Sequence, residues 1–204
     1  MDHTFGIVGL GVAAFASTNL DDLLLLASLF VDAEFSPRSI ILGQFAGMAV
    51  LVVASAAAAL AAVMIPEGRL ALLGFAPLLL GMHRFWKLWR GKLPKPGEKE
   101  FFGPEQLRRQ SHPSTVWATM ILTIANGGDN LSVYIPLFAT QRAFIVVYVL
   151  IFACLTGVWC LLGYYLTHHP RFRQRLKKYG RILVPFILVG IGLKVLGSAF
   201  FNRS

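Results

Sequence analysis

Two short polar motifs interrupt long apolar stretches of this sequence. The first reads Asn19-Leu20-Asp21-Asp22-Leu23, and the second reads Asn126-Gly127-Gly128-Asp129-Asn130-Leu131. Carboxylate and amide oxygens are the ligands that hard divalent cations prefer in proteins. At the centre of a membrane helix an ionised aspartate costs about 2.5–3.5 kcal/mol on insertion scales. We therefore expect a bound cation, or protons, to compensate the charges of Asp21, Asp22 and Asp129.

Uncharged polar groups accompany the three carboxylates. Asparagine amides offer oxygen ligands without charge. The Gly127-Gly128 pair favours a break in the helix, because glycine lowers helix stability and tolerates unusual dihedral angles. A break would free backbone carbonyls as further ligands. The predicted metal ligands are Asp21, Asp22, Asp129, Asn19, Asn126 and Asn130, with Thr18, Gln44 and Thr123 as supporting residues around them.

Asp21 and Asp22 cannot both face one ion from a regular helix, because adjacent side chains point about 100° apart. Either the helix opens locally, or one carboxylate faces the ion while the other faces a neighbouring helix. Lys194 is the one basic residue that we expect near the depth of these carboxylates. A single lysine cannot neutralise three of them.

The elements that must position these residues are membrane helices. The chain has 204 residues, of which 56% are hydrophobic and only 14% are charged, whereas about a quarter of the residues of a soluble domain are charged. Six apolar stretches are each close to the length of about 20 residues that crosses a bilayer. We predict an all-α integral membrane protein with one polytopic domain over 1–204 and transmembrane helices at 5–30, 39–65, 70–88, 116–138, 143–167 and 180–201.

The basic residues are distributed unevenly between the connections of these six helices. The first, third and fifth connections carry 15 of the 19 lysines and arginines, with Arg84 counted among them, and the opposite side carries three. In multi-pass membrane proteins such an excess marks the cytoplasmic side. The asymmetry predicts a cytoplasmic loop at 90–115 and places both termini outside the cytoplasm. It also accounts for the net charge of +9 without a nucleic-acid partner.

The two halves of the chain resemble each other. The Asn/Asp motifs fall at similar depths in the first and fourth stretches. The third and sixth stretches each hold a proline, Pro77 or Pro185, followed by aliphatic residues and a glycine, Gly81 or Gly190. Three spans used twice must enter the membrane from opposite faces, which is the inverted repeat of many transporters. We predict helix breaks near both motifs and three-helix repeats over 1–89 and 116–204.

These features together resemble the CadD-like cadmium resistance transporters of the LysE superfamily. The resemblance rests on both Asn/Asp motifs, on Tyr134-Ile135-Pro136, on Gly43-Gln44 and on the proline-to-glycine pattern, and it covers essentially the whole chain. It implies efflux of a divalent heavy metal, cadmium in the first place, across a bacterial inner membrane. It also implies that Asp21, Asp22 and Asp129 bind the ion. The metal would be cargo, so we expect neither a cofactor nor an enzymatic activity.

The charges of the site suggest how export is driven. Three carboxylates exceed the charge of one divalent ion, so protons are expected to replace the ion when it leaves a site at this depth. The sequence contains no ATP-binding motif. We therefore predict a metal/proton antiporter in the lipid bilayer, either as a monomer or as a homo-oligomer.

The residues leave four alternatives open. Oxygen ligands suit Mn²⁺ or Ca²⁺ as well as cadmium. A LysE-type amino-acid exporter would bind a substrate ammonium with the carboxylates, but only Lys194 is expected for the substrate carboxylate. A membrane thiol oxidoreductase would need Cys154 and Cys160 to meet, although residues six apart lie on different helix faces, and we expect both in the core. The last alternative is a partner protein with structural carboxylates.

The predicted orientation can be tested by cysteine labelling in a background without Cys154 and Cys160. Because of the charge asymmetry, Ser111→Cys should react with an impermeant thiol reagent only from the cytoplasmic side. Asn202→Cys should react only from outside. The measurement compares whole cells with inverted vesicles, and labelling of position 202 only from the cytoplasm would contradict this orientation.

Overall fold

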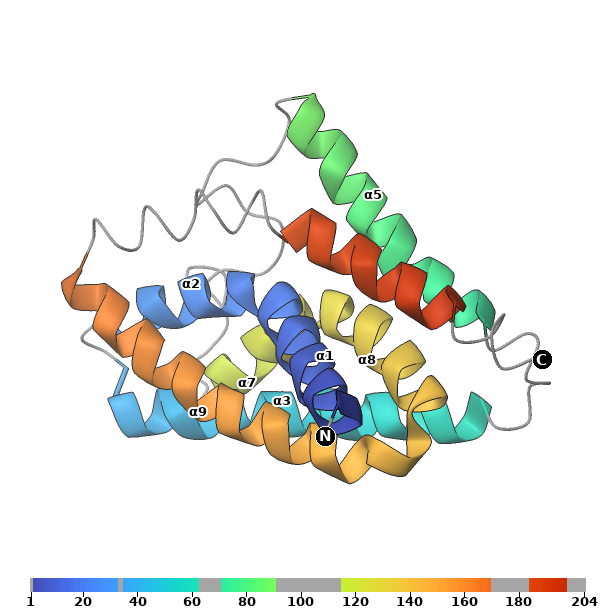
Figure 1. The fold of residues 1–204 in the computed structure, drawn as a ribbon. Helices are drawn as coiled ribbons and strands as arrows, with labels where there is room; N and C mark the ends of the chain where they lie inside the picture. The colour runs from blue at the N-terminus through green and yellow to red at the C-terminus, as the bar shows by residue number, and fades with distance from the viewer. Residues whose placement is uncertain (1, 33–34, 63–70, 91–114, 170–183, 198–204) are drawn as a thin grey trace.

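The computed structural model in Figure 1 describes residues 2–32, 35–62, 71–90, 115–169 and 184–197. All regular structure within these ranges is helical, which confirms the predicted all-α class. The predicted loop at 90–115 and the basic segment at 170–181 lie almost wholly outside the described residues.

The helices follow one another along the chain with short connections wherever both neighbours are described. They are α1 (Asp2–Thr18), α2 (Leu20–Leu29), α3 (Pro37–Ala61), the 3₁₀ turn η2 (Ala71–Gly74), α5 (Phe75–Trp89), α7 (Thr115–Asn126), α8 (Gly128–Thr140), the 3₁₀ turn η3 (Arg142–Phe144), α9 (Ile145–His168) and a last helix at Val184–Gly197.

Two helical segments are long and apolar enough to cross a membrane. They are α3 and the continuous segment Arg142–His168, and α1 with α2 passes the same test as one span bent by 55°. Two further helices, α7 and Val184–Gly197, are apolar but shorter. These features are typical of a multi-pass membrane protein. Of the six predicted spans, two or three are therefore matched by length and composition within the described residues.

Both polar motifs coincide with helix breaks, as predicted. The chain leaves helical geometry at Asn19, with φ −104° and ψ 12°, and again at Gly127, with φ −77° and ψ 7°. Neither φ angle requires glycine. A Cβ atom added to Gly127 would lie 2.4 Å from a methyl carbon of Leu51. Glycine at this break therefore allows close packing of α3 through Leu51, and the unusual dihedral angle that the sequence suggested is absent.

Glycines of α3 hold α7 unusually close. A Cβ atom added to Gly43 would lie 2.5 Å from the carbonyl oxygen of Val116, and one added to Gly47 would lie 2.7 Å from Cβ of Thr123. Small residues four apart let membrane helices approach in this way. Since the paired residues advance together along both helices, α3 and α7 run parallel.

Two other helix pairs have a defined direction. The α1–α2 pair runs parallel to α9. Gly11 of α1 packs against Tyr148 near the start of α9, and Leu26 of α2 packs against Gly163 near its end. By contrast, α5 runs antiparallel to the last helix. In that pair a Cβ on Gly74 would touch Leu196, whereas one on Gly81 would touch Val189, and Figure 1 shows the two helices side by side.

An aromatic core joins α1, α8 and α9. It consists of Phe15, Tyr134, Phe138, Tyr148 and Phe152, all of which are at most 1% exposed. The rings of Tyr134 and Phe152 are closest, with centroids 4.4 Å apart. Packed aromatic pairs add stability beyond the area that they bury. This core fixes the end of α1 against α8 and so brings the two polar motifs together.

The close contact between α3 and α7 makes a prediction about stability. Gly43→Ala should destabilise the protein by about 1–3 kcal/mol, because the new methyl group overlaps the Val116 carbonyl and α7 must move. The measurement is unfolding by SDS in mixed micelles, followed by circular dichroism. Gly9→Ala is the matched control, since a Cβ there meets nothing within 4 Å. Equal stability of the two variants would contradict the close packing.

Candidate functional site

Side-chain amides connect the two helix breaks directly. Asn130 Nδ2 donates to Asn19 Oδ1 at 3.3 Å, and Asn19 Nδ2 donates to the Tyr134 hydroxyl at 2.7 Å. All three side chains are buried, with Asn130 the most exposed at 1%. Buried polar groups are costly unless they are paired. This network therefore fixes the first motif to the second.

The backbone of Asn19 is held from a third helix. Its carbonyl oxygen accepts a hydrogen bond from Trp159 Nε1 at 2.7 Å and another from the Leu23 amide at 3.0 Å. The side-chain amide also donates to the Phe15 carbonyl at 2.9 Å. Asn19 thus connects α1, α8 and α9 at the bend. The sequence analysis missed Trp159, although an indole N–H in the middle of an apolar span needs a partner.

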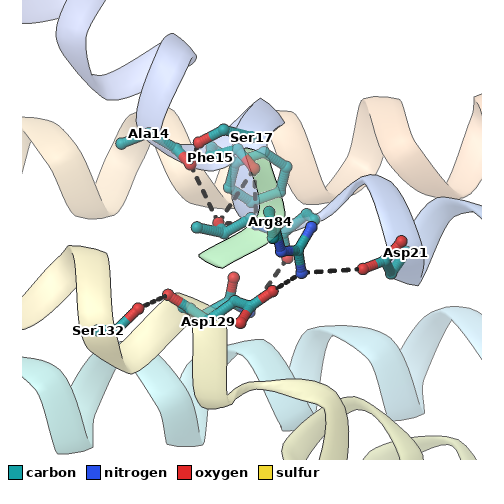
Figure 2. Close-up of polar contacts among 10 residues, drawn as sticks. Ala14, Phe15, Ser17, Asp21, Arg84, Asp129 and Ser132 are labelled. Carbon is teal, nitrogen blue, oxygen red and sulfur yellow. Dashed lines mark hydrogen bonds and ion pairs between the residues drawn. The ribbon is translucent and has the colours of Figure 1, made fainter. Parts of the chain in front are cut away.

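One cation, Arg84 of α5, bridges carboxylates from the two motifs. Its Nη2 nitrogen donates to Asp129 Oδ2 and, at 3.2 Å, to Asp21 Oδ2. Figure 2 shows the guanidinium between the two acids. The side chains of Arg84 and Asp129 are 20% and 22% exposed, whereas that of Asp21 is 57% exposed. Since both oxygens contact the same nitrogen, one small cation could reach both.

The expectation that Lys194 is the one basic residue near these carboxylates was wrong, because Arg84 contacts two of them. Lys194 is exposed on the last helix, and no described ion pair joins it to the three carboxylates. The partner is Arg84, which the count of basic residues had assigned to a cytoplasmic connection. Arginine can extend its long apolar stem inward from near the end of a helix. The signal was available, because Arg84 falls inside the predicted 70–88 span and not after it.

Asp22 faces a different helix from Asp21. It is 3% exposed, and its Oδ2 accepts a hydrogen bond from Gln44 Nε2 at 3.3 Å. Gln44 Oε1 in turn accepts from the Thr123 hydroxyl at 2.6 Å. The two adjacent aspartates thus face different neighbours, directly after the helix break at Asn19. Gln44 contacts the carboxylate of Asp22, and Thr123 contacts Gln44.

The carboxylates share one electrostatic feature. Asp21 and Asp22 lie in the first turn of α2, and Asp129 lies in the first turn of α8. The first N–H groups of a helix lack partners within it, and they give that end a partial positive charge. The helix breaks therefore place a helix N-terminus, which favours negative charge, beside each group of aspartates.

The remaining predicted residues are less directly placed for binding. Asn126 ends α7 and is partly buried, and the Thr18 hydroxyl donates to the Ala14 carbonyl at 3.0 Å. Asn130 Oδ1 is buried and has no hydrogen-bond partner. Among the described residues, no group of three or more His, Cys, Asp or Glu side chains is arranged to hold a metal. The three aspartates thus lie near one another without forming a closed coordination sphere.

The two cysteines lie apart from this site. Cys160 is buried in an apolar cluster that includes Leu26 and Leu122, as expected. Cys154 is exposed, so the expectation that it fills the core was wrong. Both are free thiols on one helix. Among the described residues, no contact joins either thiol to the three aspartates.

Comparison with known proteins identifies the family. A family model described as cadmium resistance transporter matches residues 15–200, a range that contains both polar motifs and Arg84. No curated protein and no solved structure matches the chain. The match covers most of the chain and agrees with the resemblance found in its motifs. The chain belongs to the cadmium resistance transporter family.

Proposed function

We propose that this protein exports a divalent cation, with Cd²⁺ as the first candidate, from the cytoplasm across a bacterial inner membrane in exchange for protons. The observation that carries the proposal is the convergence of Asp21 and Asp129, from two different helix breaks, on one cationic group. A metal ion seated there would draw its ligands from both halves of the chain. The family description supports the direction and the class of cargo.

The ligands follow from the positions of the oxygens. Asp21 and Asp129 would bind the ion first, because their carboxylates already point to one place. Asp22 would turn from Gln44 to join them, and the buried amide oxygen Oδ1 of Asn130, which has no hydrogen-bond partner, is suited to the same task. Asn19 and Asn126 complete the proposed set at the ends of the breaks.

The packing directions support an inverted repeat with the site between its halves. In such a repeat the first, second and third spans correspond to the fourth, fifth and sixth. The pair formed by the second and fourth spans must therefore have the same relative direction as the pair formed by the fifth and first spans. Both pairs are parallel here, as α3 with α7 and as α9 with α1–α2. The third and sixth spans must pair with each other in antiparallel fashion, as α5 and Val184–Gly197 do. The same number of residues also separates Asp21 from Asp129 and Pro77 from Pro185.

An inverted repeat suggests how the ion crosses. In such transporters the halves rock against each other around a site near the midplane, and discontinuous helices supply the ligands. The aspartates at the broken helices would be open to the cytoplasm in one arrangement and to the outside in the other. Protons entering from outside would then displace the metal and compensate the carboxylates during the return step.

Arg84 also favours one alternative cargo. It supplies, beside Asp21 and Asp129, the cation that an amino-acid exporter would need for the substrate carboxylate. The aspartates would then bind the substrate ammonium. Titrating the purified protein with Cd²⁺ and with lysine, in parallel experiments, separates the two cargoes. Binding of lysine without binding of Cd²⁺ would favour the amino-acid exporter.

Removal of single charges tests the ion site. Asp129→Asn keeps the shape of the side chain and removes a charged ligand, so it should weaken Cd²⁺ binding by about a hundredfold. Asp21→Asn and Asp22→Asn should also weaken binding, but to unequal degrees, because the two side chains face different helices. Isothermal titration of protein in detergent measures the affinities.

Two controls accompany these variants. Asp32→Asn removes an acidic charge beyond the end of α2, outside both motifs, and should leave affinity unchanged. The double variant Cys154→Ser/Cys160→Ser should still bind and transport. If the cysteine variant lost binding while the aspartate variants kept it, the oxygen-ligand site would be wrong.

Exchange with protons makes a separate prediction about transport. In proteoliposomes at clamped membrane potential, metal movement in one direction should move protons in the other, because the emptied carboxylates need compensation. Lower pH on the external side should therefore speed export. An internal pH dye and a metal-sensitive dye measure the two fluxes together. Metal flux that ignores the proton gradient would instead indicate a channel with a ring of selective carboxylates.

A further inference from the structure

Arg84 occupies the place between the two motifs where the cargo would bind. One of its nitrogens, Nη2, contacts the carboxylates of Asp129 and Asp21, which come from the first turns of α8 and α2. The arginine itself comes from a third helix, α5. Three separate helices therefore meet at one cation.

A guanidinium and a metal ion cannot hold these oxygens at the same time. Both are cations, and a metal ion seated between the two carboxylates would take the position that Nη2 now occupies. Like charges a few ångströms apart repel strongly where water is partly excluded. Binding of a metal between Asp21 and Asp129 therefore requires that Arg84 withdraw.

The geometry allows such a withdrawal. Arg84 lies six residues before Arg90, the residue that caps the end of α5, and its long side chain can turn toward that end without a change in the backbone. The contact with Asp21 contributes little to stability, because that carboxylate is more than half exposed and exposed ion pairs stabilise weakly.

We propose that Arg84 is a tethered counter-ion that holds the empty site and is displaced by the cargo. This inference rests on the proposed function, since it assigns a role within the same ion site. It also predicts selection of the cargo by charge. A divalent cation attracts the two carboxylates more strongly than a guanidinium does, whereas a monovalent cation gains no such advantage. Arg84 would thus exclude monovalent ions without contacting the bound metal.

Affinity for Cd²⁺ alone tests the proposal with purified protein in detergent. Arg84→Ala should bind Cd²⁺ about tenfold more tightly than the wild type, because no ion pair must be broken first. Arg84→Lys should be intermediate, since lysine is a compact point charge without the planar fork of arginine. Arg90→Ala is the matched control. It removes the same charge from the end of α5, but its guanidinium lies over the Trp86 ring at 4.3 Å.

A second measurement uses guanidinium as a free competitor. Millimolar guanidinium chloride should weaken Cd²⁺ binding to Arg84→Ala and return its affinity toward that of the wild type. The wild type itself should respond much less, because its site already holds a guanidinium. A structural arginine predicts the opposite order of affinities, with the wild type tightest and Arg84→Ala weakest.

The outcomes separate the two proposals. If the wild type binds Cd²⁺ and Arg84→Ala binds no more tightly than Arg90→Ala, the displaced counter-ion is wrong and the exporter stands. If Arg84→Ala fails to fold, Arg84→Lys decides, because it must still bind more tightly than the wild type. If neither the wild type nor any Arg84 variant binds Cd²⁺, both the ion site and the counter-ion are wrong.

Discussion

Compensation of negative charge in an apolar surrounding is the constraint on which this structure depends. Ionised carboxylates are costly where water is scarce, yet three of them lie at two helix breaks. Each one is stabilised by a different combination of groups. The first turns of α2 and α8 supply partial positive charge, Gln44 donates to Asp22, and Arg84 donates to Asp21 and Asp129. The breaks, the amide network and the bridging arginine are all consequences of this one requirement.

The close packing of α3 against α7, which glycines of α3 allow, brings together the groups that compensate Asp22. Gln44 lies between Gly43 and Gly47 on the face of α3 that contacts α7, and this contact brings Thr123 within 2.6 Å of the glutamine oxygen. Larger side chains at the two glycines would push the helices apart. The hydrogen bonds that join Asp22 to α7 through Gln44 would then be broken. The same contact continues to Gly127 at the second break. The polar site and the apolar packing are therefore parts of one arrangement.

The sequence predicted those features that follow from local chemistry. Both helix breaks, the small-residue face around Gln44 and the burial of Cys160 could be expected from residue types and spacing. Features that depend on the reach of a side chain or on tertiary contact were missed. Arg84 was counted as a surface charge because its backbone lies near the end of a helix, and Cys154 was expected in the core because its whole span is apolar. Gly127 was explained by its dihedral freedom, whereas its φ angle is ordinary and its small size lets Leu51 pack closely against it.

In a carrier that returns without its cargo, the negative charges of the empty site must again be compensated. With metal bound, the positive charge of the ion compensates the aspartates, but the emptied site must pass through the same apolar surroundings to be loaded again. Protons can compensate it only when the outer pH allows them to bind. An arginine fixed to the protein is always charged and needs no gradient, so it could compensate part of the charge whenever the site is empty. Under the proposed exchange, Arg84 and the protons would have complementary roles. The arginine would limit the cost of the empty state, and the protons would give the cycle its direction.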